Sequence, residues 1–207
     1  MKMSRMDIAY LIAPVLLWPI VFVLLRGIFV YAMLVAAVSL ALFTLLRYRR
    51  YIKLSYNGGS YLSIIGLGIL GSIALYLAFF IGYQLTVLLG LNGYVSLVYT
   101  MLYSQGSRIL VAPILAIIGV SEEIYWRGGL QGYLRKNSRL FRKMPWLGST
   151  LWYSAVHLLT FNPILALAAF FVGIITGIVA ERYGIVASSI AHIAWLEAII
   201  LIIPIGA

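Results

Sequence analysis

Long apolar runs alternate with short polar or basic segments along this sequence. Most of the runs approach or exceed the roughly 18 to 20 residues with which an α-helix crosses the hydrocarbon core of a bilayer. The pattern predicts seven membrane-spanning helices, at about residues 8–25, 27–46, 61–89, 108–134, 146–161, 164–180 and 185–203. We therefore expect an all-α, polytopic transmembrane helical bundle of about seven to eight spans.

The segment 94–103 is the exception to this pattern. It is rich in Tyr and too short for a span, so it is predicted to be an interfacial or re-entrant piece, or an eighth crossing. The chain is expected to form one integral membrane domain over residues 1–207. Within it, residues 1–107 are expected to form amino-terminal helices without a signature, and residues 108–203 a core of helices that holds the candidate site residues.

Composition and charge agree with a membrane protein and exclude several other classes. Hydrophobic residues make up 64% of the chain and charged residues only 10%, outside the range of soluble globular domains. The net charge of +10 comes from Lys and Arg between the apolar runs, notably in 47–53 and 135–143, which is typical of topology signals and not of a nucleic-acid surface. The positive-inside rule predicts that the amino terminus and both basic loops face the cytoplasm. The expected location is a prokaryotic cell membrane.

The composition also limits the chemistry of any site. The chain has no Cys, so disulfides, thiol nucleophiles and Cys-based metal sites are excluded. We expect no cofactor, no nucleic acid and no redox group. The expected partner of such a chain is the lipid bilayer.

Four ionisable residues lie inside apolar runs: Glu122, Glu123, His157 and His192, the last two being the only histidines. A charge in the bilayer interior costs at least about 2.5 to 3.5 kcal/mol, so each needs a reason. At 1.5 Å per residue, counted from the side of the basic loops, the expected depths are about 18 Å for Glu122, about 16 Å for His157 and about 12 Å for His192. The convergence predicts a buried polar site, open towards the cytoplasmic side.

The two adjacent acids are predicted to have different roles, because neighbouring helical positions differ by about 100°. Glu123 and Arg127 are four residues apart and share a face, which suits a charge-assisted pair. Glu122 is then left to face a histidine. The alternative for the Glu123–Arg127 pair is a purely structural role in packing, and a single buried histidine is most often a hydrogen-bonded core residue.

Four sequence blocks resemble a known family. EEIYWRGGL (122–130), YSAVH (153–157), GIITGIVAERYG (173–184) and SIAHIAWLE (189–197) are similar to motifs of the CAAX protease and bacteriocin-processing family. These proteins are intramembrane glutamic endopeptidases and include the Ras-converting CAAX prenyl peptidases. The resemblance covers about 108–200, whereas the first half of the chain carries no recognisable signature.

The resemblance implies a peptidase in which Glu122 and His157 hold and deprotonate a water, and His192 donates to the developing oxyanion. Glu123 and Arg127 would orient the site. A buried carboxylate is a stronger base than one in water, which agrees with this role for Glu122. The third block departs from the family pattern HxxxN, because Leu196 stands where the family has an amide. One oxyanion donor is commonly worth about 10²- to 10³-fold in rate, so another donor, a slow enzyme or a lost activity are the alternatives.

The leading hypothesis is an intramembrane endopeptidase acting near the cytoplasmic membrane face, on prenylated or other membrane-associated peptides. The expected partner is then a peptide or membrane-protein substrate. Three alternatives stay open. Two histidines and a carboxylate can hold zinc, although the metalloprotease motif HExxH is absent. Intramembrane Glu and His also occur in proton-coupled transporters. A non-catalytic membrane adaptor or immunity protein of the same fold is the third alternative, and Leu196 gives it weight.

Overall fold

The computed structural model describes residues 4–54 and 60–206, and within them all regular structure is helical. Six helical segments are long and apolar enough to cross a membrane: Arg5–Leu24, Arg26–Arg47, Tyr61–Leu88, Ile109–Asn137, Pro163–Tyr183 and Ile185–Ile202. The predicted polytopic helical bundle is thereby confirmed, and six candidate spans agree roughly with the seven to eight expected.

The difference in span count comes from two short helices. The segment predicted at 146–161 forms α7 (Pro145–His157), whose 13 residues are followed by a single 3₁₀ turn. The segment 94–103 lies in α4 (Asn92–Tyr103), a helix of 12 residues. Neither reaches the length of a span that runs straight across a bilayer.

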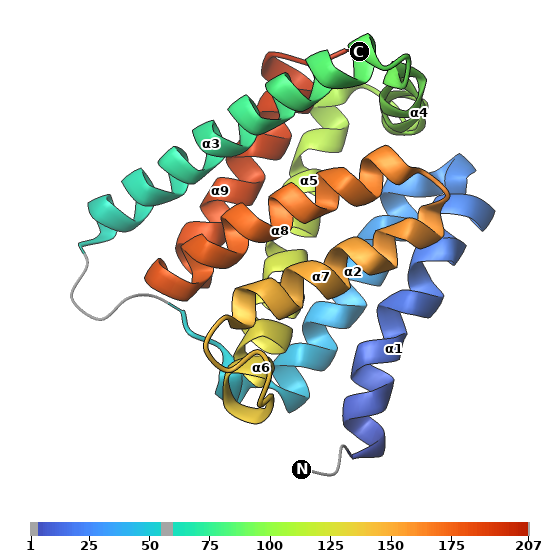
Figure 1. The fold of residues 1–207 in the computed structure, drawn as a ribbon. Helices are drawn as coiled ribbons and strands as arrows, with labels where there is room; N and C mark the ends of the chain where they lie inside the picture. The colour runs from blue at the N-terminus through green and yellow to red at the C-terminus, as the bar shows by residue number, and fades with distance from the viewer. Residues whose placement is uncertain (1–3, 55–59, 207) are drawn as a thin grey trace.

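The remaining elements follow the chain in order. α1 (Arg5–Pro19) continues into a π-helical turn, and α2 (Phe29–Arg47) returns along the bundle. α3 (Tyr61–Leu88) is followed by α4 and by α5 (Arg108–Glu123), which runs into the π-helix η4 (Ile124–Gln131) and α6 (Gly132–Asn137). α7 then pairs with α8 (Pro163–Tyr183), and α9 (Ile185–Glu197) runs beside α3, as Figure 1 shows.

Local signals explain where several of these helices begin and end. Ser4 and Asp7 form a reciprocal capping box at the start of α1. The Asn162 side chain accepts from the backbone N–H of Leu165, and Pro163 at the first position of α8 has no N–H to leave unpaired. Gly184, with φ of 91°, ends α8 and allows the immediate turn into α9.

Close helix packing depends on small residues. A Cβ at Gly68 of α3 would lie 2.7 Å from the Ile190 side chain and 2.9 Å from the Ala187 carbonyl oxygen, both on α9. A Cβ at Gly71 would lie 2.9 Å from Cβ of Ala191. α3 therefore approaches α9 directly beside His192, as small residues allow in membrane bundles.

The bundle has two distinct ends, which matter for the site. The first, here called the basic end, contains the loops 47–53 and 135–143 together with α6, at the bottom of Figure 1. The other, here called the opposite end, contains α4 and the turns 25–28, 89–91, 104–107 and 161–162. Hydrogen bonds close it: Gln105 donates to the Gly27 carbonyl, and Asn162 donates to the Tyr94 carbonyl.

Candidate active site

The two adjacent acids lie where α5 changes into a π-helix. α5 ends at Glu123, and η4 follows without a break. Both side chains are buried, with 6% of Glu122 and none of Glu123 exposed. π-helical turns inside α-helices are rare and occur frequently at functional sites.

His192 lies between the two carboxylates. Its Nδ1 is 3.0 Å from Oε1 of Glu123, a hydrogen bond, and its Nε2 is 3.8 Å from Oε2 of Glu122. The imidazole has two ring nitrogens that point in different directions. The side chains of Glu122 and Glu123 also leave their helix in different directions, and each of them lies beside one of these nitrogens. The histidine that Glu122 faces is therefore His192.

Arg127 holds the other side of Glu123. Its Nε is 3.5 Å from Oε1 of Glu123 and donates to the Thr176 hydroxyl over 2.8 Å. The guanidinium also lies over the Tyr153 ring, with Cζ 4.8 Å from the ring centroid. The predicted contact between Glu123 and Arg127 is present, and it is buried on both sides.

His157 is held by contacts separate from the acid pair. Its Nδ1 lies 2.7 Å from the Tyr153 carbonyl oxygen, and its Nε2 lies 3.0 Å from Nε1 of Trp18. An indole nitrogen only donates and a carbonyl only accepts, so the ring carries its proton on Nδ1 and accepts at Nε2. We had expected His157 to share a water with Glu122; here its accepting nitrogen is occupied by Trp18.

A cavity of about 260 Å³ connects these residues. Glu122, Tyr153, His157 and His192 line it together with a wall that is almost entirely apolar. Oε1 of Glu122 is buried and has no hydrogen-bond partner among the described residues, whereas its Oε2 accepts from the Tyr153 hydroxyl over a long 3.5 Å. One oxygen of a buried carboxylate is thus free of protein partners beside a cavity.

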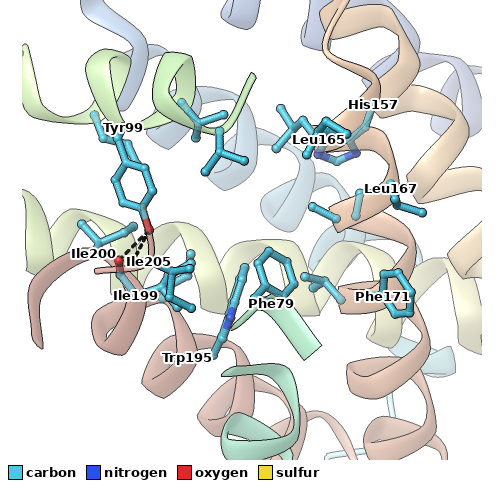
Figure 2. A pocket seen from close by; sticks show the side chains of 18 of the residues that line it. Phe79, Tyr99, His157, Leu165, Leu167, Phe171, Trp195, Ile199, Ile200 and Ile205 are labelled. Atoms are coloured by element: carbon cyan, nitrogen blue, oxygen red, sulfur yellow. Dashed lines mark hydrogen bonds between the residues drawn. The ribbon is translucent and has the colours of Figure 1, made fainter. Parts of the chain in front are cut away.

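The position of the family amide is also on this wall. Leu196 lines the cavity and has no donor to offer. Its neighbour Trp195 lines it too, and the buried indole N–H of Trp195 has no hydrogen-bond partner among the described residues. Figure 2 shows Trp195 and Phe79 on one side of the space, with His157 and Leu165 on the other.

The cavity extends from the acid pair toward the opposite end of the bundle, whereas the sequence predicts an opening toward the basic end. Counting depth along the helices led us to expect an opening toward the basic loops. The lining residues come instead from the segments nearest the opposite end: 29–33 of α2, 78–86 of α3, 94–102 of α4, 164–172 of α8 and 192–205 in and after α9. Near the basic end the space is filled, because Gln131, Glu181 and Arg135 join η4 and α6 to α8 by hydrogen bonds.

Three contacts were missed at the level of sequence. Trp18 lies in the half of the chain without motifs, and a single Trp in an apolar run gives no signal of its contact. Thr176 lies within a quoted block but was not singled out. Trp195 is three residues after His192, on the same helical face, and this spacing is the one signal that was available.

Metal ligation was left open as an alternative. Over residues 4–54 and 60–206, no three His, Cys, Asp or Glu side chains are grouped as ligands of one ion would be. The position of His157 explains this, since its two ring nitrogens contact Trp18 and the Tyr153 carbonyl and neither bonds to an acid among the described residues.

Comparison with known proteins agrees with the resemblance seen in the motifs. No curated protein and no solved structure is similar enough to match the chain. A family model described as "Type II CAAX prenyl endopeptidase Rce1-like" matches residues 104–196. The matched segment begins just before α5 and ends at Leu196, so it includes Glu122, Glu123, Arg127 and both histidines. Through this segment, the chain is similar to the Rce1-like family of type II CAAX prenyl endopeptidases.

Proposed function

We propose that this protein is an intramembrane glutamic endopeptidase that uses Glu122 as its general base. The match of residues 104–196 to the family model supports an endopeptidase in general. The observation that carries the more specific proposal is Oε1 of Glu122, a buried carboxylate oxygen without a protein partner on the wall of a cavity. Such an oxygen is available to a water and to the peptide carbonyl that the water attacks.

In the proposed reaction, Glu122 accepts a proton from water as the water oxygen bonds to the carbonyl carbon. The same proton then passes to the leaving nitrogen when the C–N bond breaks, which yields a carboxylic acid and an amine. His157 orients the water at Nε2, and for this the water must replace the indole N–H of Trp18. His192, held at Nδ1 by Glu123, donates to the oxyanion when its Nε2 carries a proton.

The second oxyanion donor is proposed to be Trp195. Leu196 supplies none, while the indole N–H of Trp195 is buried, unpaired among the described residues and on the cavity wall. A donor already fixed in a low-dielectric site stabilises developing negative charge without reorganisation. Glu123 and Arg127 act as positioning residues, since Glu123 contacts His192, Arg127 contacts Tyr153, and neither lines the cavity.

The test is cleavage by the detergent-purified protein of a mixed set of prenylated and unprenylated peptides, with products read by mass spectrometry. Glu122→Gln is expected to lower the rate by about 10²- to 10⁴-fold, the usual contribution of a general base. Glu197→Gln is the matched control, because Glu197 is another acid of a candidate span, on α9, that is not among the cavity residues.

The other possible outcomes contradict the proposal or favour one of the alternative functions. Cleavage by Glu122→Gln at the parent rate contradicts the proposal. Loss of activity with a chelator, restored by a stoichiometric ion, moves the reaction to a metal site. Glu122-dependent proton flux in proteoliposomes, without cleavage, favours a transporter, and a phenotype that Glu122→Gln leaves unchanged favours an adaptor.

A further inference from the structure

We infer that the basic end binds the phosphate group of an anionic phospholipid at Arg50 and Lys136, two cations that lie over the ring of Tyr51. The inference is independent of the proposed function, because none of these three residues lines the cavity. It follows from the contacts of the three side chains, from the unpaired charge that they hold together, and from the apolar face of α2 that ends beside them.

Tyr51 brings together two cations from different parts of the chain. It lies in the 3₁₀ turn that follows α2, and only 8% of the residue is exposed. Cζ of Arg50 is 4.9 Å from the centroid of its ring, and Nζ of Lys136, on α6, is 5.5 Å from the same centroid. Both distances are typical of cation–π contacts. The two positive charges are therefore held close together at one place on the basic end.

The hydroxyl of Tyr51 adds a neutral donor at the same place. Its oxygen accepts from Nη2 of Arg50 over 3.0 Å and from Nδ2 of Asn137 over 3.2 Å. A phenolic hydroxyl that accepts two hydrogen bonds still has its own hydrogen to donate, and among the described residues no acceptor receives it. A guanidinium, an ammonium and a hydroxyl hydrogen thus lie together, and these are donors from which the oxygens of a phosphate group accept.

The protein itself does not neutralise the two cations. Within residues 4–54 and 60–206, no acid forms an ion pair with Arg50 or Lys136. Asp7 lies beside the neighbouring ring of Tyr48, and its oxygens accept from the Tyr48 hydroxyl over 2.8 Å and from Ser4. Two like charges closer than the Debye length, about 8 to 10 Å at moderate salt, repel each other. An anion that binds to both cations relieves this repulsion.

The apolar face of α2 favours a lipid over a soluble anion. Leu42 and Leu46 are four residues apart, so they share a face of the helix, and they are 54% and 78% exposed. α2 belongs to a candidate span, so the bilayer covers this face. Arg50 follows Leu46 by four residues, just past the end of α2 at Arg47. An acyl chain that lies along the two leucines brings its head group to Arg50, and basic sites beside membrane helices bind anionic head groups.

The site lies where two segments already touch. A Cβ at Gly128 of η4 would lie 3.3 Å from the Ile52 side chain, and a Cβ at Gly132 of α6 would overlap the Tyr51 carbonyl oxygen. Loop 47–53 therefore packs directly on the chain that follows the acid pair. A phosphate bound to both cations adds a second connection between this loop and α6, so the bound lipid is expected to stabilise the basic end against unfolding.

Native mass spectrometry of the detergent-purified protein measures this binding. Phosphatidylglycerol and phosphatidylcholine with identical acyl chains are titrated separately, and the fraction of protein that carries one lipid gives each affinity. The parent is expected to bind phosphatidylglycerol at least about 5-fold more tightly, the contribution of one basic residue at a membrane surface. Arg50→Gln or Lys136→Gln should lower the affinity for phosphatidylglycerol about 5-fold, and the double variant about 30-fold. Both side chains are exposed, so these variants are expected to fold like the parent.

The matched control is the double variant Arg139→Gln, Arg142→Gln. It loses the same charge from the same end, and both residues are exposed without a contact to Tyr51. Its affinity should stay within about 2-fold of the parent value, because water and salt screen exposed charges away from the bound head group. Equal losses for the two double variants overturn the inference, since they indicate diffuse attraction. An unchanged preference for phosphatidylglycerol in Arg50→Gln, Lys136→Gln also overturns it, and inorganic phosphate that binds as tightly as the lipid excludes the lipid as the specific occupant.

Discussion

The indole N–H of Trp18 donates to Nε2 of His157 over 3.0 Å, and both side chains are buried. This contact joins α1, which lies outside the family-matched segment, to a histidine of the family motif. It fixes the tautomer of His157. The indole N–H can only donate a hydrogen bond, so Nε2 accepts, and the Tyr153 carbonyl can only accept one, so Nδ1 carries the proton. Trp18 therefore keeps Nε2 unprotonated until a water replaces the indole.

Trp18→Phe removes this donor and keeps an aromatic ring. Because the water must replace the indole before it can bind at Nε2, we expect kcat to rise about 3- to 10-fold, the value of the one hydrogen bond that no longer has to be broken, with little change in KM. The ¹⁵N spectrum of labelled histidine should also change for one of the two histidines of the chain, as the His157 tautomers mix. Trp126→Phe is the control, since the N–H of Trp126 is buried without a described partner and its ring packs on Trp18. Identical spectra for the parent and Trp18→Phe contradict this role.

Trp195→Phe tests the proposed second oxyanion donor. A loss of about 10²- to 10³-fold in kcat is expected if the indole N–H stabilises the transition state. The double variant Trp195→Phe, Leu196→Asn should recover part of the loss, because it places the family amide on the same wall. Single-turnover rates of the parent, the two single variants and the double variant give the coupling free energy between positions 195 and 196. Equal rates for the parent and Trp195→Phe would assign the donor to another group.

Arg127→Gln is expected to destabilise the protein strongly. It removes the guanidinium beside the fully buried carboxylate of Glu123, and breaking one side of a buried ion pair costs about 3 to 5 kcal/mol. Arg135→Gln is the matched control, because the Arg135–Glu181 pair is about 29% exposed on both sides and is worth at most about 1 kcal/mol. Thermal unfolding in detergent compares the two. A smaller shift for Arg127→Gln than for Arg135→Gln contradicts the prediction.

Gly68→Ala tests the packing of α3 on α9. A Cβ there would press on the Ala187 carbonyl oxygen, which belongs to the backbone and cannot move away alone. We expect a loss of about 1 to 3 kcal/mol. Gly66→Ala, two residues earlier in the same helix, meets nothing within 4 Å and should be neutral or slightly stabilising. Equal melting temperatures for the two variants would mean that α9 shifts freely.

The sequence predicted the bundle because spans of apolar residues are local features. Glu123 and Arg127 were predicted as a pair for the same reason, since their spacing of four residues alone brings them together. The shared contact of Glu122 and Glu123 with His192 was not predicted, because it depends on where α9 lies beside α5. No local pattern contains that information.

The side on which the cavity lies could not be predicted either. Glu122 and His192 are near the middle of their spans, so counting depth from one end gives no direction. The side toward which the cavity extends depends on which side chains fill the space around Glu122 and His192. Gln131 and Arg135 fill it on one side by bonding to Glu181, while on the other side residues such as Ala168 and Gly82 leave it open.

The π-helix after Glu123 gives this stretch a tolerance for chain length that an α-helix lacks. Each π-helical hydrogen bond encloses one residue more than an α-helical one. Deleting one residue from an α-helix rotates everything after it by about 100°, whereas a deletion within 124–131 is taken up when the π-helix tightens towards an α-helix. Glu122 and Glu123 would then still face His192, and Gln131 and Arg135 would still reach Glu181. Single-residue changes in length can therefore accumulate in this stretch during evolution without separating the acid pair from the anchor that holds α8.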